Sequence, residues 1–291
     1  MAEGGAGLNI LIALAPAFFW GILPLVVSRV GGTPVQQIIG TTVGTLLVSI
    51  VVAMIMPPTL SSTVFWYSFA SGACWAFGQM NQYRSFLQIG VSNAMPVSTG
   101  MQLVSTSLVG VLVFGEWPSL SDKVLGFFAI ALIVLGIYLT THQEGEGHEG
   151  VDMRAGVITL LISTVGYVGY SYFPRAGHID GQDAFLPQAV GMVAMSLAMP
   201  LFFRGSSPFN RKTVQNLLGG FIFAAAALAY LLSAYRNGIA TGFTLSQMNV
   251  VLATLGSIYI LGEKKTRKEM GYVLTGLALV VAGGIMIGLN A

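Results

Sequence analysis

Ten long apolar runs constrain the fold of this chain more than any other feature. Each run holds roughly 20 mostly apolar residues, enough for an α-helix to cross the hydrocarbon core of a membrane. The runs are too long and too uniformly apolar for the alternating strands of a membrane β-barrel. We therefore predict an all-α membrane protein with ten transmembrane helices, at about 8–28, 35–56, 64–87, 92–114, 122–141, 155–173, 184–203, 214–235, 239–261 and 270–289.

The composition agrees with a chain embedded in a lipid bilayer. Hydrophobic residues make up 54% of it and charged residues 8%, whereas a soluble domain carries about 25% charged residues. A net charge of +2 is too small to indicate a nucleic-acid partner. The first residues, MAEGGAG, contain no Lys or Arg, so we expect no secretory signal peptide and a retained first span.

The second half of the sequence repeats the first. VFGEW at 113–117 matches ILGEK at 260–264, and Gln37-x-x-Gly40 corresponds to Gln188-x-x-Gly191. The break falls in the polar stretch HQEGEGHEG, which predicts one repeat at 1–143 and another at 144–291. Five spans are an odd number, so the two units would cross the membrane in opposite directions, as a 5+5 inverted repeat. The alternative is that apolar helices resemble one another by chance.

The positive charges predict an orientation. Lys and Arg gather in the short loops on the inner side of a membrane. With both termini outside, ten of these residues fall inside and three outside, so we predict that orientation. The inner set is Arg29, Arg84, Arg154, Arg204, Arg211, Lys212, Lys264, Lys265, Arg267 and Lys268, and the outer set is Lys123, Arg175 and Arg236.

One polar face stands out in the third span. Trp75, Gln79 and Gln82 are spaced i, i+4, i+7, which places them on one side of a helix. An aromatic ring and two primary amides suit a small neutral sugar, because the ring packs on the apolar face of a pyranose and each amide both donates and accepts. The alternative is that the glutamines only join helices, with bonds of about 0.6 kcal/mol each.

The fourth and ninth spans carry a related set of polar residues. Ser98, Thr99 and Gln102 lie in the fourth, and Gln247 and Asn249 lie in the ninth. Gln102 and Asn249 are equivalent in the repeat, so we expect the two amides to meet near the membrane midplane, where transporters of this plan bind substrate.

Two further pairs are matched by the repeat. Trp20 and Tyr170 are equivalent aromatic residues that act either as stacking platforms and gates or as ordinary interfacial residues. Gln37 and Gln188 are equivalent amides near the ends of their spans, with the same two interpretations. We include all four as candidate substrate-binding residues.

Few residues could carry a coupling proton. Carboxylates are the usual proton carriers in transporters, and none lies mid-span. Glu116 and Glu263, at equivalent span ends, are the best candidates. The strong alternative is that each is a partly solvated, structural residue at a helix end. The histidines lie scattered in loops and no phosphate-binding GxxxxGK[ST] loop is present. We therefore expect no enzyme activity, no cofactor and no metal.

Three stretches resemble a known family. GVSNAMPVSTGMQLVSTSLVGVLVFGEW at 90–117, PAFFWGILPLVVSRVGGTPVQQIIGTTVG at 16–44 and LGEKKTRKE at 261–269 are similar to the bacterial glucose/ribose porter family of the drug/metabolite transporter superfamily. The resemblance implies a ten-span sugar uptake protein of the bacterial plasma membrane, with proton symport and a cavity between the repeats. It implies no role for any single residue.

The expectation from all of these features is a secondary transporter of a neutral monosaccharide, glucose first and ribose second, that works by alternating access. Two alternatives of the same class are an uncoupled sugar facilitator and an exporter of metabolites or amino acids. A cationic or zwitterionic substrate would need a buried carboxylate, which the spans lack. A membrane enzyme would need His or Asp clustered in the spans, and a sensor would need a soluble output domain. The sequence leaves the oligomeric state open.

Overall fold

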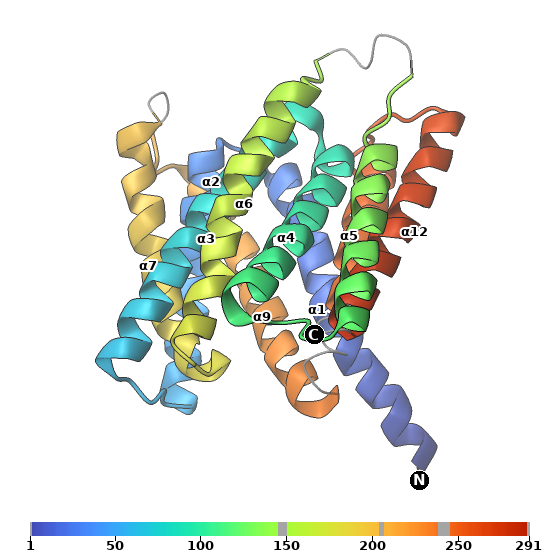
Figure 1. The fold of residues 1–291 in the computed structure, drawn as a ribbon. Coiled ribbons are helices and arrows are strands. Elements are labelled where there is room, and N and C mark those ends of the chain that lie inside the picture. Colours follow the sequence, from blue (N-terminus) through green and yellow to red (C-terminus); the bar gives the residue numbers. More distant parts are fainter. Residues whose placement is uncertain (1, 145–149, 204–206, 238–244, 290–291) are drawn as a thin grey trace.

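The structure is a bundle of α-helices (Figure 1), taken from a computed structural model that describes residues 2–144, 150–203, 207–237 and 245–289. No strand occurs within these residues. The helices are α1 (Ala2–Val30), α2 (Pro34–Ile55), α3 (Ser62–Ile89), α4 (Val91–Phe114), α5 (Leu120–Thr140), α6 (Met153–Ala176), α7 (Gly181–Phe202), α8 (Arg211–Gln215), α9 (Leu217–Asn237), α11 (Asn249–Ile260) and α12 (Arg267–Leu289).

The all-helical prediction is confirmed for the described residues. Seven helices are long and apolar enough to cross a membrane, and the apolar parts of α1 and α11 are shorter. The remaining long helix, α3, has 28 residues but is not among the seven. Its hydropathy is lower because serines, amides, Trp and Tyr occupy many positions where the other helices have aliphatic side chains. The buried residues of α3 include Ser68, Ser71, Gln79, Asn81, Gln82 and Ser85.

The predicted eighth and ninth spans differ in detail from the structure. The eighth is divided at Asn216 into the short α8 and the long α9. In the ninth, residues 238–244 lie outside the described residues, and a turn at 247–248 precedes α11. The described part of the predicted ninth span is therefore interrupted before α11 begins.

The helices of the two halves pack on each other in matched pairs. α3 contacts α6 and α7, and α9 contacts α1 and α2. α4 contacts α6, and α11 contacts α1. α5 and α12 form a pair at one edge of the bundle, with α7 at the opposite edge (Figure 1). Most helices therefore find their neighbours in the other half of the chain.

Glycines allow α3 and α7 to cross at backbone distance. A Cβ on Gly72 would overlap the carbonyl oxygen of Gln188 and lie 2.7 Å from its carbonyl carbon. A Cβ on Gly191 would overlap the carbonyl oxygen of Phe69 in the same way. Small residues at such crossings are the usual means by which membrane helices pack closely. This crossing holds α3, with its polar face, deep in the bundle.

The loops that carry most of the basic residues meet at one end of the bundle. Lys212 donates to the carbonyl of Val30 at 2.6 Å, and Arg29 donates to the carbonyl of Ile260 at 3.5 Å. Helix α1 begins and α12 ends at the opposite end (Figure 1). The segments from α4 to α5 and from α6 to α7 also lie there. We call the two ends of the bundle the basic end and the terminal end.

Candidate functional site

A continuous network of uncharged polar side chains crosses the centre of the bundle. On α3, the Gln79 Nε2 donates to Gln82 Oε1 at 2.7 Å. The Gln82 Nε2 donates to Ser98 Oγ on α4 at 2.7 Å, and the Gln102 Nε2 donates to the same oxygen at 3.0 Å. The Tyr167 hydroxyl on α6 lies 2.8 Å from Gln79 Oε1 and 3.0 Å from Gln82 Oε1. Three helices therefore share one chain of hydrogen bonds.

The structure places Trp75, Gln79 and Gln82 on one buried face of α3, as the spacing predicts. The Trp75 ring is 3% exposed and packs on Phe223 of α9, with ring centroids 4.2 Å apart. In this conformation Phe223 covers the Trp75 ring, so a sugar could stack there only after Phe223 moves. Asn81 lies off this face and donates to the carbonyl of Phe77 in its own helix.

Tyr167 is the member of the network that the sequence prediction missed. The repeat aligns Trp20 with Tyr170, and the same offset places Ala17 opposite Tyr167, so the comparison of halves favoured Tyr170. A signal was present in α6 itself, because Ser163, Tyr167 and Ser171 recur every fourth residue. Such a spacing places polar groups on one helical face.

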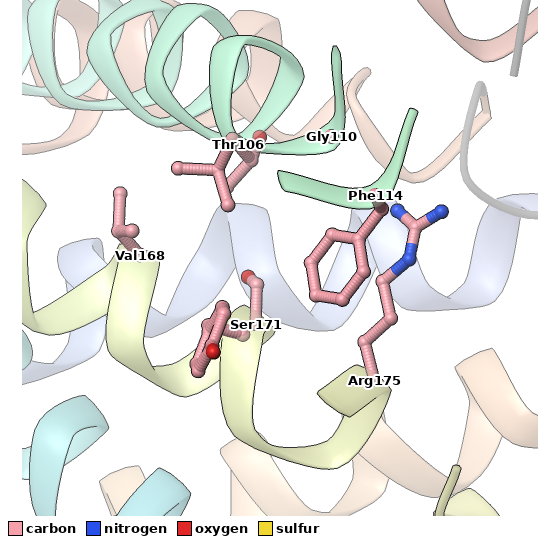
Figure 2. A pocket seen from close by; sticks show the side chains of 8 residues that line it. Thr106, Gly110, Phe114, Val168, Ser171 and Arg175 are labelled. Carbon is pink, nitrogen blue, oxygen red and sulfur yellow. The ribbon is translucent and has the colours of Figure 1, made fainter. Parts of the chain in front are cut away.

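A cavity lies one helical turn from the network, toward the terminal end. Thr106 lies one helical turn after Gln102 on α4, and its hydroxyl donates to the Gln102 carbonyl. Ser171 lies one turn after Tyr167 on α6 and donates to its carbonyl in the same way. The cavity between these helices has a volume of about 70 Å³ and is lined by Thr106, Val109, Gly110, Phe114, Val168, Ser171, Tyr172 and Arg175 (Figure 2). Ligand pockets usually enclose roughly 300–1,000 Å³, so this cavity would have to widen to pass a sugar.

The ion pair Arg175–Glu116 lies at the outer end of this cavity. The Arg175 guanidinium also lies over the Phe114 ring, 4.5 Å from its centroid, and both side chains line the cavity in Figure 2. Arg175 lies in the last turn of α6 and Glu116 follows α4, so the pair joins the two halves of the chain. The sequence-predicted coupling residue Glu116 therefore lies beside the cavity and has a cationic partner.

The other coupling candidate, Glu263, holds the start of α4 at the basic end. Its Oε1 accepts from the Val91 N–H at 2.7 Å and its Oε2 accepts from the Ser92 N–H at 2.9 Å. A carboxylate at a helix N-terminus satisfies free N–H groups and complements the helix dipole. Nearby, Lys265 donates to Asn93 Oδ1 at 2.7 Å, and burial lowers the pKa of Lys265. These contacts tie the α11–α12 loop to α4.

We expect Glu263→Ala to destabilise the fold by about 1–3 kcal/mol, because two N–H groups at the start of α4 lose their acceptor. The thermal unfolding midpoint of the purified protein in detergent would fall by several degrees. Lys264→Ala is the control, because Lys264 is the exposed neighbour of Glu263 in the same loop. Equal midpoints for the two variants would contradict this role for Glu263.

Two polar residues of the predicted ninth span form hydrogen bonds to Ser246 in the same segment. Asn249 Nδ2 donates to the carbonyl of Ser246 at 2.6 Å, and Gln247 Nε2 lies 3.3 Å from Ser246 Oγ. The Gln102 Nε2 donates to Ser98 Oγ, and the Gln102 carbonyl accepts from Thr106 Oγ1, both on its own helix. Among the described residues, Gln102 and Asn249, which we expected to meet, are hydrogen-bonded to other partners in this conformation. Thr99, beside the network on α4, is buried.

The matched pairs of the two halves join helices. Gln188 of α7 donates to Ser71 Oγ on α3 at 3.0 Å, and Ser71 donates to the carbonyl of Tyr170 on α6. Gln37 of α2 donates to the carbonyl of Val27 on α1 at 3.3 Å. Trp20 packs on Tyr230 of α9, with ring centroids 5.7 Å apart. None of these four residues lines the cavity of Figure 2.

A bundle of helices that are long and apolar enough to cross a membrane defines a multi-pass membrane protein. The family model described as sugar transport protein matches residues 11–290. The chain therefore belongs to the sugar transport protein family, and it is a transporter and not an enzyme.

Relatives with names for sugar uptake match nearly the whole chain. A protein of Listeria monocytogenes named for sugar uptake is 52% identical, covering 97% of this chain and 99% of the relative. A protein of Latilactobacillus sakei named for ribose uptake is 47% identical over 95% and 96%, respectively. A protein of Bacillus anthracis named for glucose uptake is 43% identical over 97% and 99%.

A solved crystal structure has the same fold. It superposes with a TM-score of 0.61 over 96% of both chains, at 16% sequence identity. At this identity the likeness describes the fold alone.

Proposed function

We propose that this protein takes up a neutral monosaccharide, glucose first and ribose second, and that the network of Gln79, Gln82, Ser98, Gln102 and Tyr167 binds it. The observation that carries the proposal is the absence of charge from this buried network. Amides and hydroxyls suit a solute whose polar groups are hydroxyls. Relatives named for glucose uptake and for ribose uptake support the substrate class.

Transport in this proposal is alternating access by two inverted five-helix repeats, divided at 143/144. The matched packing supports the repeat, because the contacts of α3 with α6 and α7 have counterparts in those of α9 with α1 and α2. The network belongs to α3, α4 and α6, and therefore to both halves. A rocking motion of one half against the other would open the site to each side of the membrane in turn.

Glu116 is the first candidate for proton coupling in this proposal, and Glu263 is the second. Glu116 lies beside the cavity and is paired with Arg175, so a change in its protonation would alter the contact that ends the cavity. Glu263 is bound to the backbone of α4. If an imposed pH gradient leaves sugar uptake into liposomes unchanged, the protein is an uncoupled facilitator.

The proposed orientation places both termini outside and the basic end inside the cell, following the excess of Lys and Arg in the loops at that end. A cysteine at the exposed Lys264, in a chain with Cys74→Ala, should resist labelling by an impermeant maleimide in intact cells. Labelling from outside would reverse the orientation.

The decisive experiment is counterflow of radiolabelled glucose and ribose in proteoliposomes, with unlabelled sugars and amino acids as competitors. We expect accumulation of labelled sugar that neutral monosaccharides inhibit and amino acids do not. Liposomes without protein give the background. Counterflow of amino acids with no counterflow of sugar would instead identify an exporter of metabolites.

A further inference from the structure

Two rows of residues lead from the network to the terminal end of the bundle. Each row takes every fourth residue of its helix, and residues spaced in this way lie one above the other. The rows are Ser98, Gln102, Thr106, Gly110 and Phe114 on α4, and Tyr167, Ser171 and Arg175 on α6. The inner members belong to the network, and the outer members line the cavity between the two helices. The network and the cavity are therefore joined by one continuous lining.

The hydroxyl groups of this lining have a defined direction. Thr106 Oγ1 donates to the carbonyl of Gln102 at 2.7 Å, and Ser171 Oγ donates to the carbonyl of Tyr167 at 3.2 Å. A backbone carbonyl can only accept, so each hydroxyl has used its one proton, and its oxygen keeps the capacity to accept. The rings of Phe114 and Tyr172, with centroids 5.7 Å apart, add apolar surface to the same cavity. The lining can therefore accept hydrogen bonds from a passing sugar without breaking its own.

The contacts of Arg175 close the space between the two rows at their outer end. Arg175 pairs with Glu116, and its guanidinium lies 4.5 Å from the centroid of the Phe114 ring. Figure 2 shows the arginine and the ring together at one end of the cavity. The cavity, of about 70 Å³, has to widen to pass a sugar. Because the arginine contacts join the end of α6 to the end of α4, they have to open for this widening.

The turn after α4 places Glu116 for this contact. Gly115 has a φ of +69°, and the Glu116 N–H donates to the carbonyl of Gly110 at 3.1 Å. A Cβ on Gly110 would overlap the Glu116 carboxylate, and a Cβ on Gly126 of α5 would overlap the ring of the buried Trp117. A carboxylate at a helix C-terminus opposes the helix dipole, so its position does not by itself stabilise α4. The two side chains of the ion pair are 48% and 23% exposed, and such pairs add little to folding stability. The pair can therefore open without unfolding the bundle.

We propose that the sugar passes between α4 and α6 at the terminal end, and that Arg175 and Glu116 are the gate of this route. The inference rests on the proposed function, and it adds the path and the two residues that control it. The gate opens when Arg175 leaves Glu116 and Phe114, and it closes when these contacts form again. In the open state the sugar passes Thr106 and Ser171 on its way to the network.

The test measures how fast a cysteine in the route reacts with a water-soluble maleimide. Thr106→Cys is introduced with Cys74→Ala, and the protein is purified in detergent, because Thr106 is half-buried between the network and the gate. We expect glucose, and ribose less strongly, to slow the reaction. Glu116→Gln should speed it roughly two- to fivefold, the effect of losing one partly exposed ion pair. Arg175→Gln should do the same, and it serves if Glu116→Gln does not fold. Arg175→Glu combined with Glu116→Arg should return the rate toward the natural one.

Lys123→Gln is the matched control, because it removes an exposed cation of α5 that does not line the cavity. It should leave the reaction rate unchanged. In chains that keep Thr106, the natural Cys74 of α3 is partly buried and reports general loosening of the bundle. It should react at one rate in all gate variants, whereas a merely structural ion pair would lower the thermal unfolding midpoint and change this rate too.

Two results would overturn the inference while sugar counterflow, and with it the proposed function, stands. Equal Thr106→Cys rates with and without the gate substitutions would exclude the gate, and a rate that neither glucose nor ribose slows would exclude the route. Absence of all sugar counterflow in the natural protein would instead overturn the proposed function, and the maleimide rates measured without sugar would still decide the gate.

Discussion

Gln82→Met is expected to reduce sugar counterflow by roughly two orders of magnitude. The change removes the link between the Gln79–Tyr167 side of the network and the Ser98–Gln102 side. It also leaves buried donors and acceptors without partners, at about 1–3 kcal/mol for each such group. Methionine keeps the length and volume of glutamine, so packing of α3 should be retained. The measurement is the initial rate of glucose counterflow per reconstituted protein.

Asn81→Met is the matched control for this experiment. Asn81 is an adjacent buried amide of the same helix, but its bond is to the carbonyl of Phe77 in its own helix. Its replacement should change transport by less than about threefold, as expected for loss of a local bond. Normal transport by both Gln82→Met and Gln102→Met would mean that the sugar binds elsewhere.

Gly72→Val is expected to prevent correct folding. The new side chain would meet the backbone of Gln188, which cannot rotate away as a side chain can. Helices α3 and α7 would have to separate, and α3 carries the polar face of the site. Gly72→Ala, the milder change, should cost about 1–3 kcal/mol or more through overpacking. Size-exclusion chromatography and thermal unfolding in detergent measure both variants.

Gly271→Ala provides the comparison within the same chain. Its Cβ would meet nothing within 4 Å, so the unfolding midpoint should be unchanged or slightly raised. If Gly72→Val gave a monodisperse protein with the natural midpoint, the α3–α7 crossing would not be as close as described.

Hydropathy and spacing predicted much of the fold and part of the site. Apolar runs identify helices because each must satisfy its backbone within the membrane, and the i, i+4, i+7 spacing placed Trp75, Gln79 and Gln82 on one buried face. Hydropathy alone would have missed α3 as a membrane span, because its polar residues are buried against neighbouring helices.

Other features depended on tertiary contacts that one sequence does not contain. Tyr167 joins the network because α6 packs on α3 at a register that spacing within α6 cannot specify. Phe223 covers Trp75 for the same reason, since α9 is distant in sequence. The turn at 247–248 precedes α11, and it carries no Pro or Gly that would have predicted it.

The hydrogen bonds between Glu263 and the start of α4 link thermal stability to the rate of transport. Helix α4 carries Ser98 and Gln102 at the centre of the bundle, and its first N–H groups are bound by a residue from the other half. A motion that separates the halves at the basic end must release these bonds before the site can open there. In the proposed alternating-access cycle, the contact that we expect to delay melting would therefore also add to the barrier for transport. We therefore expect a variant that weakens this contact to lose heat resistance and to gain turnover number.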